Sequence, residues 1–444
     1  MARAPMTGGI SHTPSPLTLI TYALPAVILA VIYLPLFSYV TPFYVAERGV
    51  DLAAIGAAWI AIRLFDAVSD PVIGWVSDRT KARFGRRRLW LGLSVPVILL
   101  GTWQAFVPPE DAGLGHAIFW LFVLTLGWTM AQTPYAAWGA EIAEDYDGRT
   151  RVTAWREGFV LIGTLVATLV YFGAGAGGEG LAALALVVAI GLPLTVLAAF
   201  AGTEDRGGAG ADLPSLREGW QAMRENLPFR RVLLAWFVNG AANGIPVTLF
   251  LFFVGDVLLG EGVVLEAVGL EVAAASLLTY FATAILGIPF WSFLARQIGK
   301  HRAWGLAMLW ASVVFGWALT LGPGDFASFL WISALTGLAF GADLALPPAI
   351  QADVVELDTR RTGARRAGIF FAIWQVATKA SLALSSGLAL MALGWAGFET
   401  GGQNSEAALA TLSYLYAGVP IVLKLLAVAL MWRFPLDRMA MQQA

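Results

Sequence analysis

Cysteine is absent from this chain of 444 residues, which excludes disulfides, thiolate metal centres and cysteine nucleophiles together. Histidine is almost as scarce, because only His12, His116 and His301 occur and they have no metal-ligand spacing. Charged residues make up 13% of the chain, whereas a globular domain has ~25%. The formal net charge is −2, and no part of the chain has the excess of lysine and arginine of a basic domain. We therefore expect no cofactor and no nucleic-acid partner.

Long apolar runs take the place of these missing features. Hydrophobic residues make up 58% of the chain, and a helix of ~20 apolar residues is long enough to cross a bilayer. About twelve such spans can be read from the hydropathy pattern. Their approximate limits are 17–43, 52–76, 89–107, 115–138, 153–175, 181–201, 231–258, 268–296, 303–322, 327–353, 367–392 and 409–433. The pattern predicts an all-α membrane protein with twelve transmembrane helices.

Basic residues indicate which side of the membrane each loop occupies. They gather after spans two, four, eight and ten and in the central loop, all on the side of the two termini. Loops on the other side contain Arg48 and otherwise glycine, glutamate and aspartate. Since cytoplasmic loops carry an excess of lysine and arginine, we expect both termini in the cytoplasm of a bacterial inner or plasma membrane.

A polar segment at 202–230 divides the chain into two six-span halves, 1–201 and 231–444. Within it, Asp212 and Pro214 suit the N-cap and first turn of a helix. This helix either lies on the membrane or the bundle, or is a solvated linker.

The loop between spans two and three has a weak counterpart in the second half. Trp75 to Trp90 contains a run of basic residues between two tryptophans, and Trp291 to Trp304 repeats that pattern after span eight. Two related six-helix halves around a midplane site are a common transporter architecture. The sequence therefore predicts a secondary transporter that works by alternating access.

Three charged residues lie inside span two. Arg63, Asp66 and Asp70 are three and four residues apart, so they share one helix face. A charge at that depth costs ~2.5 kcal/mol or more on insertion scales. Such residues are usually retained for an ion pathway or a counter-ion, and two carboxylates one turn apart could hold a small cation.

These residues belong to a longer motif. Gly74 to Arg87 resembles the loop motif of the major facilitator superfamily. Arg63 to Pro71, followed by that loop, resembles more specifically the glycoside–pentoside–hexuronide:cation symporter family, which includes melibiose permease. The similarity continues through Thr129 to Tyr135, Asp147 to Glu157 and Lys379.

The resemblance implies a site for Na⁺, Li⁺ or a proton. Carried over position by position, its ligands are Asp66, Ser69 and Asp70, with Thr129 from span four. Carboxylate and hydroxyl oxygens are hard ligands that suit an alkali ion. Burial favours the protonated carboxyl, so a proton can compete for the same site.

The sugar-binding part of the family pattern is missing. The acid expected in span one aligns with the apolar run Ile28 to Val31, and the acid of span four aligns with Gln132. The aromatic platform after it aligns with Ala136. A sugar- or glycoside-like solute is what the family implies. A lysolipid or amphiphilic anion, carried by symport or flipped on the same fold, is the alternative.

Several polar residues inside other spans are candidates for the solute site. Lys379 is either a charge partner of the span-two acids, an anchor for substrate, or a lysine that reaches the membrane interface. Trp374 and Gln375, one turn earlier, either line the same cavity or pack between helices. Asn239 and Asn243 either line the cavity or form hydrogen bonds between helices.

Other charges suggest gates. Arg156 either contacts substrate, as the family's arginine does, or forms a gate ion pair with Glu157. Asp343 in span ten has a cavity or gate role, or pairs with a neighbouring helix. Charges at the cytoplasmic helix ends form either a network between the halves that closes the inner side or simple solvated charges, namely Asp78, Arg79, Glu141, Asp353 and Glu356. The full set of gating candidates is Arg63, Asp78, Arg79, Glu141, Asp343 and Asp353.

An enzyme is the rival from another class. Asp66-x-x-x-Asp70 has the aspartate spacing of intramembrane prenyltransferases, which need a second acidic motif at the same membrane depth. The nearest, Asp353 to Asp358, lies at the cytoplasmic end of span ten, whereas the first pair is mid-span. We therefore expect a transporter and not an enzyme, with a small-molecule or lipid-like substrate, surrounding membrane lipids and no obligate protein partner.

Overall fold

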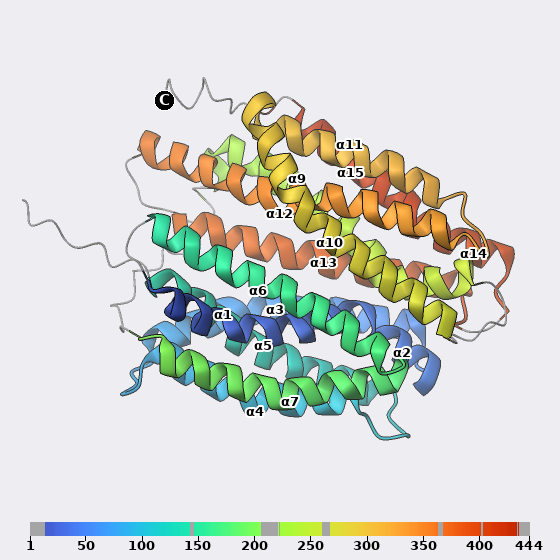
Figure 1. The fold of residues 1–444 in the computed structure, drawn as a ribbon, viewed down its shortest axis with the longest axis horizontal. Coiled ribbons are helices and arrows are strands. Elements are labelled where there is room, and N and C mark those ends of the chain that lie inside the picture. Colours follow the sequence, from blue (N-terminus) through green and yellow to red (C-terminus); the bar gives the residue numbers. More distant parts are fainter. Residues whose placement is uncertain are drawn as a thin grey trace, which may run out of the picture.

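A computed structural model of the chain describes residues 14–142, 146–205, 221, 223–259, 267–362, 367–400, 403–432 and 434. Regular structure in these residues is helical throughout, and the long helices run roughly side by side (Figure 1). The helix start predicted at Asp212 lies outside the described residues.

Among the described residues, the first half of the chain supplies seven helices. Six of them are long, and α2 is a short helix that continues the end of α1. The bounds are α1 (Pro16–Ser38), α2 (Val40–Arg48), α3 (Leu52–Arg79), α4 (Arg86–Phe106), α5 (Leu114–Ile142), α6 (Tyr146–Gly173) and α7 (Gly177–Gly202).

The second half repeats this plan with two π-helical turns. The bounds are α9 (Leu227–Phe252), η1 (Phe253–Leu258), α10 (Ala267–Ile298), α11 (Lys300–Ala318), α12 (Phe326–Thr362), α13 (Ala367–Trp395), α14 (Glu406–Ser413), η2 (Tyr414–Gly418) and α15 (Val419–Met431). The last predicted span thus consists of α14, η2 and α15 in succession.

Helix starts follow local capping chemistry. Ser15, Asp51 and Ser405 each accept a hydrogen bond from a backbone N–H in the first turn of α1, α3 and α14. Such a side chain satisfies an N–H that has no partner within the helix.

The described helices agree with the predicted spans. Eleven are long and apolar enough to cross a membrane. The twelfth, α11, has 19 residues and is less hydropathic because it begins with Lys300, His301 and Arg302 and contains three tryptophans. It packs beside α10, α12 and α15 as a full member of the bundle. The all-helical, twelve-helix prediction is confirmed.

The helices form two groups that meet along three pairs. Helices α1 to α7 pack mainly with one another, as do α9 to α15 (Figure 1). Contacts between the groups join α3 to α13, α6 to α10 and α1 to α9. Counting long helices only, the second helix of each half thus meets the fifth helix of the other half. The first helices of the two halves meet each other. Such matched pairing is what a twofold relation between the halves produces.

Buried apolar side chains form two separate clusters. One is continuous across both halves and includes Val188 of the first half with Phe253 and Leu393 of the second. The other contains residues of the second half alone, among them Trp304 and Met431.

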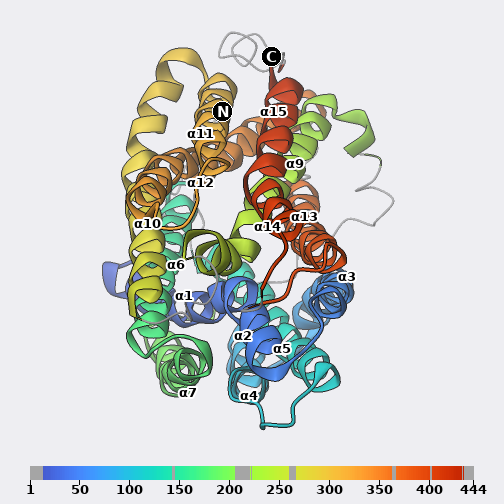
Figure 2. The ribbon, with the colours of Figure 1, turned by 90° about the vertical axis from the view of Figure 1, so that its right-hand side faces the viewer.

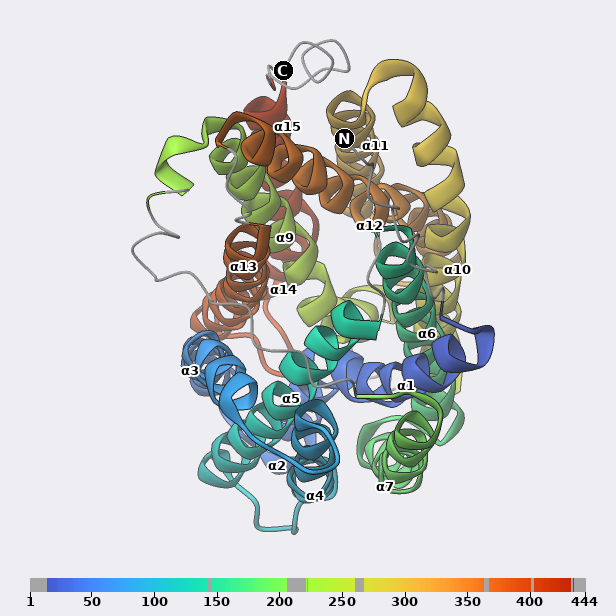
Figure 3. The same ribbon diagram turned by 90° about the vertical axis from the view of Figure 1, so that its left-hand side faces the viewer.

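In the first half the shared cluster runs the length of the helices, since it also contains Leu19 and Ala199, whereas its members in the second half lie toward α14. The end with α2 and α14 faces the viewer in Figure 2, and Figure 3 faces the opposite end. The halves are therefore joined by an apolar core at the end farther from the termini.

Candidate functional site

The two acids of α3 share one lysine from the other half. Asp66 is completely buried and Asp70 partly so. Lys379 Nζ, on α13, lies 3.1 Å from Asp66 Oδ1 and 2.5 Å from Asp70 Oδ2. A single ammonium thus bridges two carboxylates one helical turn apart, and it does so across the α3–α13 contact between the halves.

A second cation contacts Asp66 on its other oxygen. Arg63 Nη1 lies 3.3 Å from Asp66 Oδ2. The Arg63 guanidinium also sits 4.2 Å from the centre of the Phe37 ring and 5.6 Å from that of Trp59, where ring faces attract a cation. Arg63 is therefore held by packing as well as charge. Two acids and two bases leave this cluster with no formal net charge.

Hydroxyl groups from α5 complete the site. Thr129 Oγ1 donates to Asp66 Oδ1 at 2.8 Å, and Thr133 Oγ1 donates to Asp70 Oδ1 at 3.4 Å. Thr129 is a predicted ligand, whereas Thr133 is not, although its place one turn after Thr129 could have indicated it. Ser69 Oγ donates instead to the backbone carbonyl of Asp66 at 3.2 Å.

The donor set of this acid cluster indicates what it can hold. Its oxygens come from two carboxylates and two hydroxyls, which are hard ligands suited to an alkali ion or a proton. The described part of the chain contains no group of three or more His, Cys, Asp or Glu that could hold a metal ion. The Lys379 ammonium lies between the two carboxylates, where a small cation would have to bind.

A second buried charge cluster lies within the second half. Lys424 Nζ, on α15, lies 2.9 Å from Asn239 Oδ1, 2.7 Å from Asn243 Oδ1 and 3.8 Å from Asp343 Oδ2. Asn243 Nδ2 and Trp304 Nε1 donate to the two oxygens of Asp343 at 2.8 and 2.6 Å. All of these contacts join helices of one half, so the cluster moves with that half.

Lys424 is a residue that the sequence reasoning missed. Asn239, Asn243 and Asp343 are predicted candidates, but the lysine that joins them is not. The signal is the same one that identifies Lys379, namely a lone lysine well inside an apolar span. Lys424 is only 6% exposed, which excludes a side chain that extends to water.

The remaining solute candidates have partners or exposures of their own. Trp374 stacks on Trp236, with ring centres 5.0 Å apart, and Gln375 beside it is exposed. Gln132 on α5 is half-buried. Arg156 Nη2 on α6 pairs with its neighbour Glu157 at 2.7 Å. These contacts are local to each residue and join none of them to the two lysine clusters.

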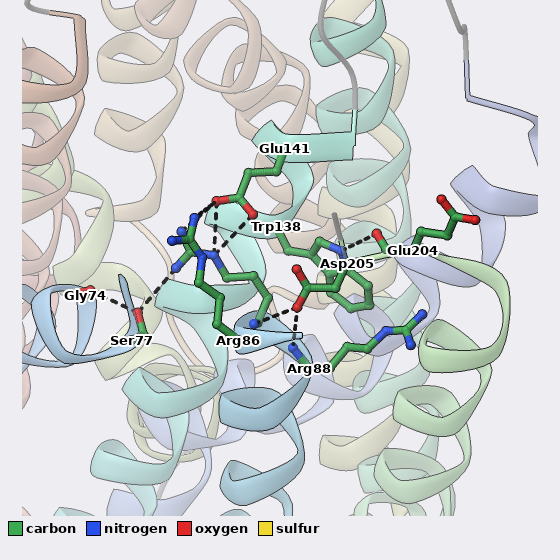
Figure 4. Close-up of polar contacts among 9 residues, drawn as sticks. Gly74, Ser77, Arg86, Arg88, Trp138, Glu141, Glu204 and Asp205 are labelled. Carbon is green, nitrogen blue, oxygen red and sulfur yellow. Dashed lines mark hydrogen bonds and ion pairs between the residues drawn. The ribbon is translucent and has the colours of Figure 1, made fainter. Parts of the chain in front are cut away.

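The loop motif after α3 forms an ion cluster inside the first half (Figure 4). Arg86 Nη2 and Arg87 Nη2 lie 2.9 and 2.7 Å from Glu141 Oε1 on α5. Arg87 Nη1 also donates to Ser77 Oγ at 3.3 Å. The motif thus ties α3, α4 and α5 together near the end of the bundle that bears the termini.

Asp205 caps the start of α4 in the same cluster (Figure 4). Its Oδ2 accepts the backbone N–H groups of Arg87 and Arg88 at 2.8 and 3.2 Å, where a negative charge also complements the helix dipole. The N-cap position is Gly85, with φ +100°, and a Cβ there would overlap the Asp205 carboxylate. Glycine at this position leaves room for the acid.

Other predicted gate residues have partners within their own half. Lys300 Nζ lies 2.7 Å from Asp353 Oδ2, and the Arg79 guanidinium lies 4.3 Å from the centre of the Trp75 ring. The side chain of Asp78 lies outside the described residues. Arg63 and Asp343 belong to the two mid-bundle clusters described above.

Comparison with known proteins decides the class of transporter. Residues 21–438 match the family model described as MFS/sugar transport protein, where MFS denotes the major facilitator superfamily. The chain belongs to this family.

Relatives within and around the family are symporters. An uncharacterized symporter of Synechocystis is 26% identical over 461 aligned residues, covering 81% of this chain and 82% of that protein. The sodium-dependent lysophosphatidylcholine symporter 1-A of Danio rerio is 24% identical, covering 86% of this chain and 77% of its own. A crystal structure of a bacterial homologue of the human lysosomal transporter Spinster, inward-facing and unoccupied, shares the fold with a TM-score of 0.67 at 14% identity, covering 94% and 95%.

Family membership establishes the general function. This major facilitator protein is an integral membrane transporter, and its relatives include an uncharacterized symporter, an isoprimeverose transporter and a lysophosphatidylcholine symporter. The resemblance noted in the sequence is confirmed. The prenyltransferase alternative is wrong, since members of this family are transporters and not enzymes.

The ion cluster of the transporter's first half leads to a stability prediction. Glu141→Gln removes the charge that Arg86 and Arg87 share, and Arg87 is only 4% exposed. We expect destabilisation by about 3 kcal/mol, the lower end of the range for breaking a buried pair, because the Glu141 side chain stays partly exposed. Thermal unfolding of purified protein measures the loss. The matched control is Glu157→Gln, whose more exposed side chain pairs with a single arginine, so its loss should cost far less.

Proposed function

We propose that the protein couples the movement of Na⁺ or a proton to the symport of an organic solute. The observation that carries the proposal is the bridge from Lys379 to both acids of α3. A cation that binds Asp66 and Asp70 must displace this ammonium. Cation binding therefore changes an ionic contact between the two halves, which is the contact that alternating access has to remake.

Charge balance explains why solute and cation would bind together. The cluster of Arg63, Lys379 and the two acids is formally neutral, so an added cation leaves one positive charge in excess. Buried excess charge is costly unless it is paired. A solute that presents an anionic or hydrogen-bond-accepting group to the released Lys379 compensates that charge. Each ligand then favours binding of the other, as reciprocal coupling requires.

The proposed orientation makes this conformation inward-facing. With the termini in the cytoplasm, the apolar core shared by both halves closes the outer end. Ser38 Oγ donates to Val247 O at 2.9 Å across the α1–α9 contact of this end. The inward-facing bacterial Spinster homologue, which has the same fold, is consistent with such a state.

The solute is proposed to bind between the halves, near Asn243, Gln132 and Lys379. The family description favours a sugar- or glycoside-like compound. The second candidate is a lysolipid or another amphiphilic anion, favoured by the absence of any acid in α1 and by the similarity to the zebrafish lysophosphatidylcholine symporter. Uptake assays with glycosides and with lysolipids, each with and without sodium, distinguish the two.

Replacing Lys379 tests the proposed exchange of ammonium for cation. Lys379→Ala leaves two carboxylates without their bridge, so we expect a loss of roughly 3–5 kcal/mol of stability in sodium-free buffer. Sodium should then restore the thermal midpoint, at concentrations at least about tenfold lower than those that affect the native protein. The reason is that the Lys379 ammonium no longer competes with sodium for the carboxylates, and each 1.4 kcal/mol of competition removed raises the sodium affinity about tenfold. If a proton is the coupling ion, lowering the pH restores the midpoint instead.

Lysine replacement elsewhere provides the control. Lys300→Ala removes an ammonium from one carboxylate, Asp353, in a more exposed pair. Its thermal midpoint should respond to sodium and pH as that of the native protein does. In all of these measurements potassium replaces sodium wherever needed to keep the ionic strength constant. The proposal would be overturned if the thermal midpoint of Lys379→Ala responded to sodium and to pH no more than that of Lys300→Ala.

A further inference from the structure

A cavity of about 90 Å³ lies inside the second half, next to the Lys424 cluster. Its wall comes from α9, α10, α11, α12, η2 and α15, and α1 contributes Leu34 and Ser38. Since α1 belongs to the first half, movement of the halves changes the shape of the cavity. The proposed cation exchange at Asp66 and Asp70 makes no use of this space.

The cavity wall is rich in aromatic side chains. Seven of its side chains are rings, namely Phe250, Tyr280, Phe281, Phe315, Phe329, Phe340 and Tyr416. Several already pair, as Tyr280 does with Phe340 at 5.4 Å between centres, and such surfaces attract a further ring or alkyl group. An apolar cavity of about 150 Å³ admits benzene in a well-studied engineered protein. The smaller space here suits one ring after modest adjustment, or a short alkyl arm.

One end of the cavity is polar but has no formal net charge. Asn243, Asp343 and Lys424 line it, and the charges of Asp343 and Lys424 cancel. An anionic or cationic ligand group would therefore be buried without a compensating charge. A hydroxyl group can accept a hydrogen bond from Lys424 and donate one to Asp343. The polar end thus favours an uncharged group.

An unpaired hydroxyl also lines this space. Ser276 is 1% exposed, and its Oγ has no hydrogen-bond partner among the described residues. A buried polar group left in that state costs about 1–3 kcal/mol. Cavities that stay empty are lined by apolar atoms, so the free hydroxyl indicates an occupant that can form hydrogen bonds.

We propose that this cavity binds the uncharged end of an amphiphilic solute, which carries an apolar ring or a short alkyl arm. The hydroxyl group of that solute bonds to Lys424 and Asp343, and a second polar atom reaches Ser276. The inference rests on the proposed function in taking the occupant to be part of the transported solute. It assigns the choice of solute to the second half and the cation to the acids of α3.

Site-directed thiol labelling tests the assignment, because the chain contains no other cysteine. Ser276→Cys places one thiol on the cavity wall, and methyl methanethiosulfonate modifies it at a measurable rate. Three matched compounds are then added to the full-length protein in detergent: benzyl alcohol, benzoate and benzylamine. We expect benzyl alcohol to slow modification at least threefold and the two ions to have little effect.

Two further variants make the result specific. Leu306→Cys, on an α11 side chain that is 46% exposed and does not line the cavity, should show no protection and thus controls for effects on the micelle. Ala311→Leu in the Ser276→Cys protein fills part of the cavity and should remove the protection. Equal rates with and without benzyl alcohol, or stronger protection by either ion, would overturn the inference.

Labelling requires no ion gradient, so its result is independent of coupling. Protection by benzyl alcohol in a protein whose uptake ignores sodium and pH would leave the cavity assignment intact and defeat the proposed coupling. Cation-driven uptake in a protein whose cavity thiol shows no protection would support the proposed coupling and defeat the cavity assignment.

Discussion

Asp66→Asn and Asp70→Asn should each abolish cation-driven accumulation of solute while largely sparing exchange of solute across the membrane. Asp66 is completely buried and bonded to Thr129, Lys379 and Arg63. An amide keeps much of the shape and the hydrogen bonds but cannot supply the charge that attracts a cation. Coupling between two ligands is typically worth 1–3 kcal/mol, or ~5–150-fold in affinity, and this is the factor we expect to lose.

Proteoliposomes with an imposed sodium gradient, and separately a pH gradient, measure the driven uptake, and counterflow measures exchange. Asp325→Asn makes the same chemical change in the loop before α12, where Asp325 accepts the backbone N–H of Gly322, and should leave both activities unchanged. Full driven uptake in both α3 variants would defeat the coupling assignment. Loss of exchange together with uptake would indicate a structural role.

Gly387→Val should prevent the outer end from closing. At this position α13 approaches α3 so closely that a Cβ would overlap Ile60 and lie 2.9 Å from the carbonyl oxygen of Gly56. A backbone atom cannot rotate away as a side chain can. Overpacking of this kind costs about 1–3 kcal/mol, which shifts an equilibrium between two states by ~5–150-fold. The protein should accumulate in the outward-open state and transport slowly.

Accessibility at the outer end measures this shift. In a Ser38→Cys background, the thiol lies at the α1–α9 contact where Ser38 is 2% exposed, and Gly387→Val should speed its reaction with a membrane-impermeant maleimide. Gly305→Val is the matched control, since a Cβ on this helical glycine meets no atom within 4 Å. Unchanged labelling and unchanged transport in Gly387→Val would show that the halves separate elsewhere.

Much of the fold follows from the sequence because lipid leaves the backbone few alternatives. A chain that crosses hydrocarbon must satisfy its N–H and C=O groups internally, so each long apolar run becomes a helix. Helix α11 has a lower mean hydropathy than the other spans. It is still predictable from its length and its place between polar loops. The boundary at 202–230 remains a prediction, since most of that segment lies outside the described residues.

The candidate site was predictable only in part. Asp66 and Asp70 stand out because a charge inside an apolar span is costly and therefore rare. Thr133 and Lys424 were missed for different reasons. A threonine in a membrane helix is common and carries no signal alone, while Lys424 is a lone lysine inside an apolar span that no recognisable motif surrounds.

By itself, the sequence determined that this protein spans a membrane with paired acids in its second long span, because hydropathy and helical spacing are local properties. Only the tertiary structure decided that Lys379 bridges those acids and that Lys424 gathers Asn239, Asn243 and Asp343. In the chain these partners lie from 81 residues apart, for Asp343 and Lys424, to 313 residues apart, for Asp66 and Lys379. Their distances depend on which helices pack together, and packing is set by side-chain shape summed over the whole bundle rather than by any short segment.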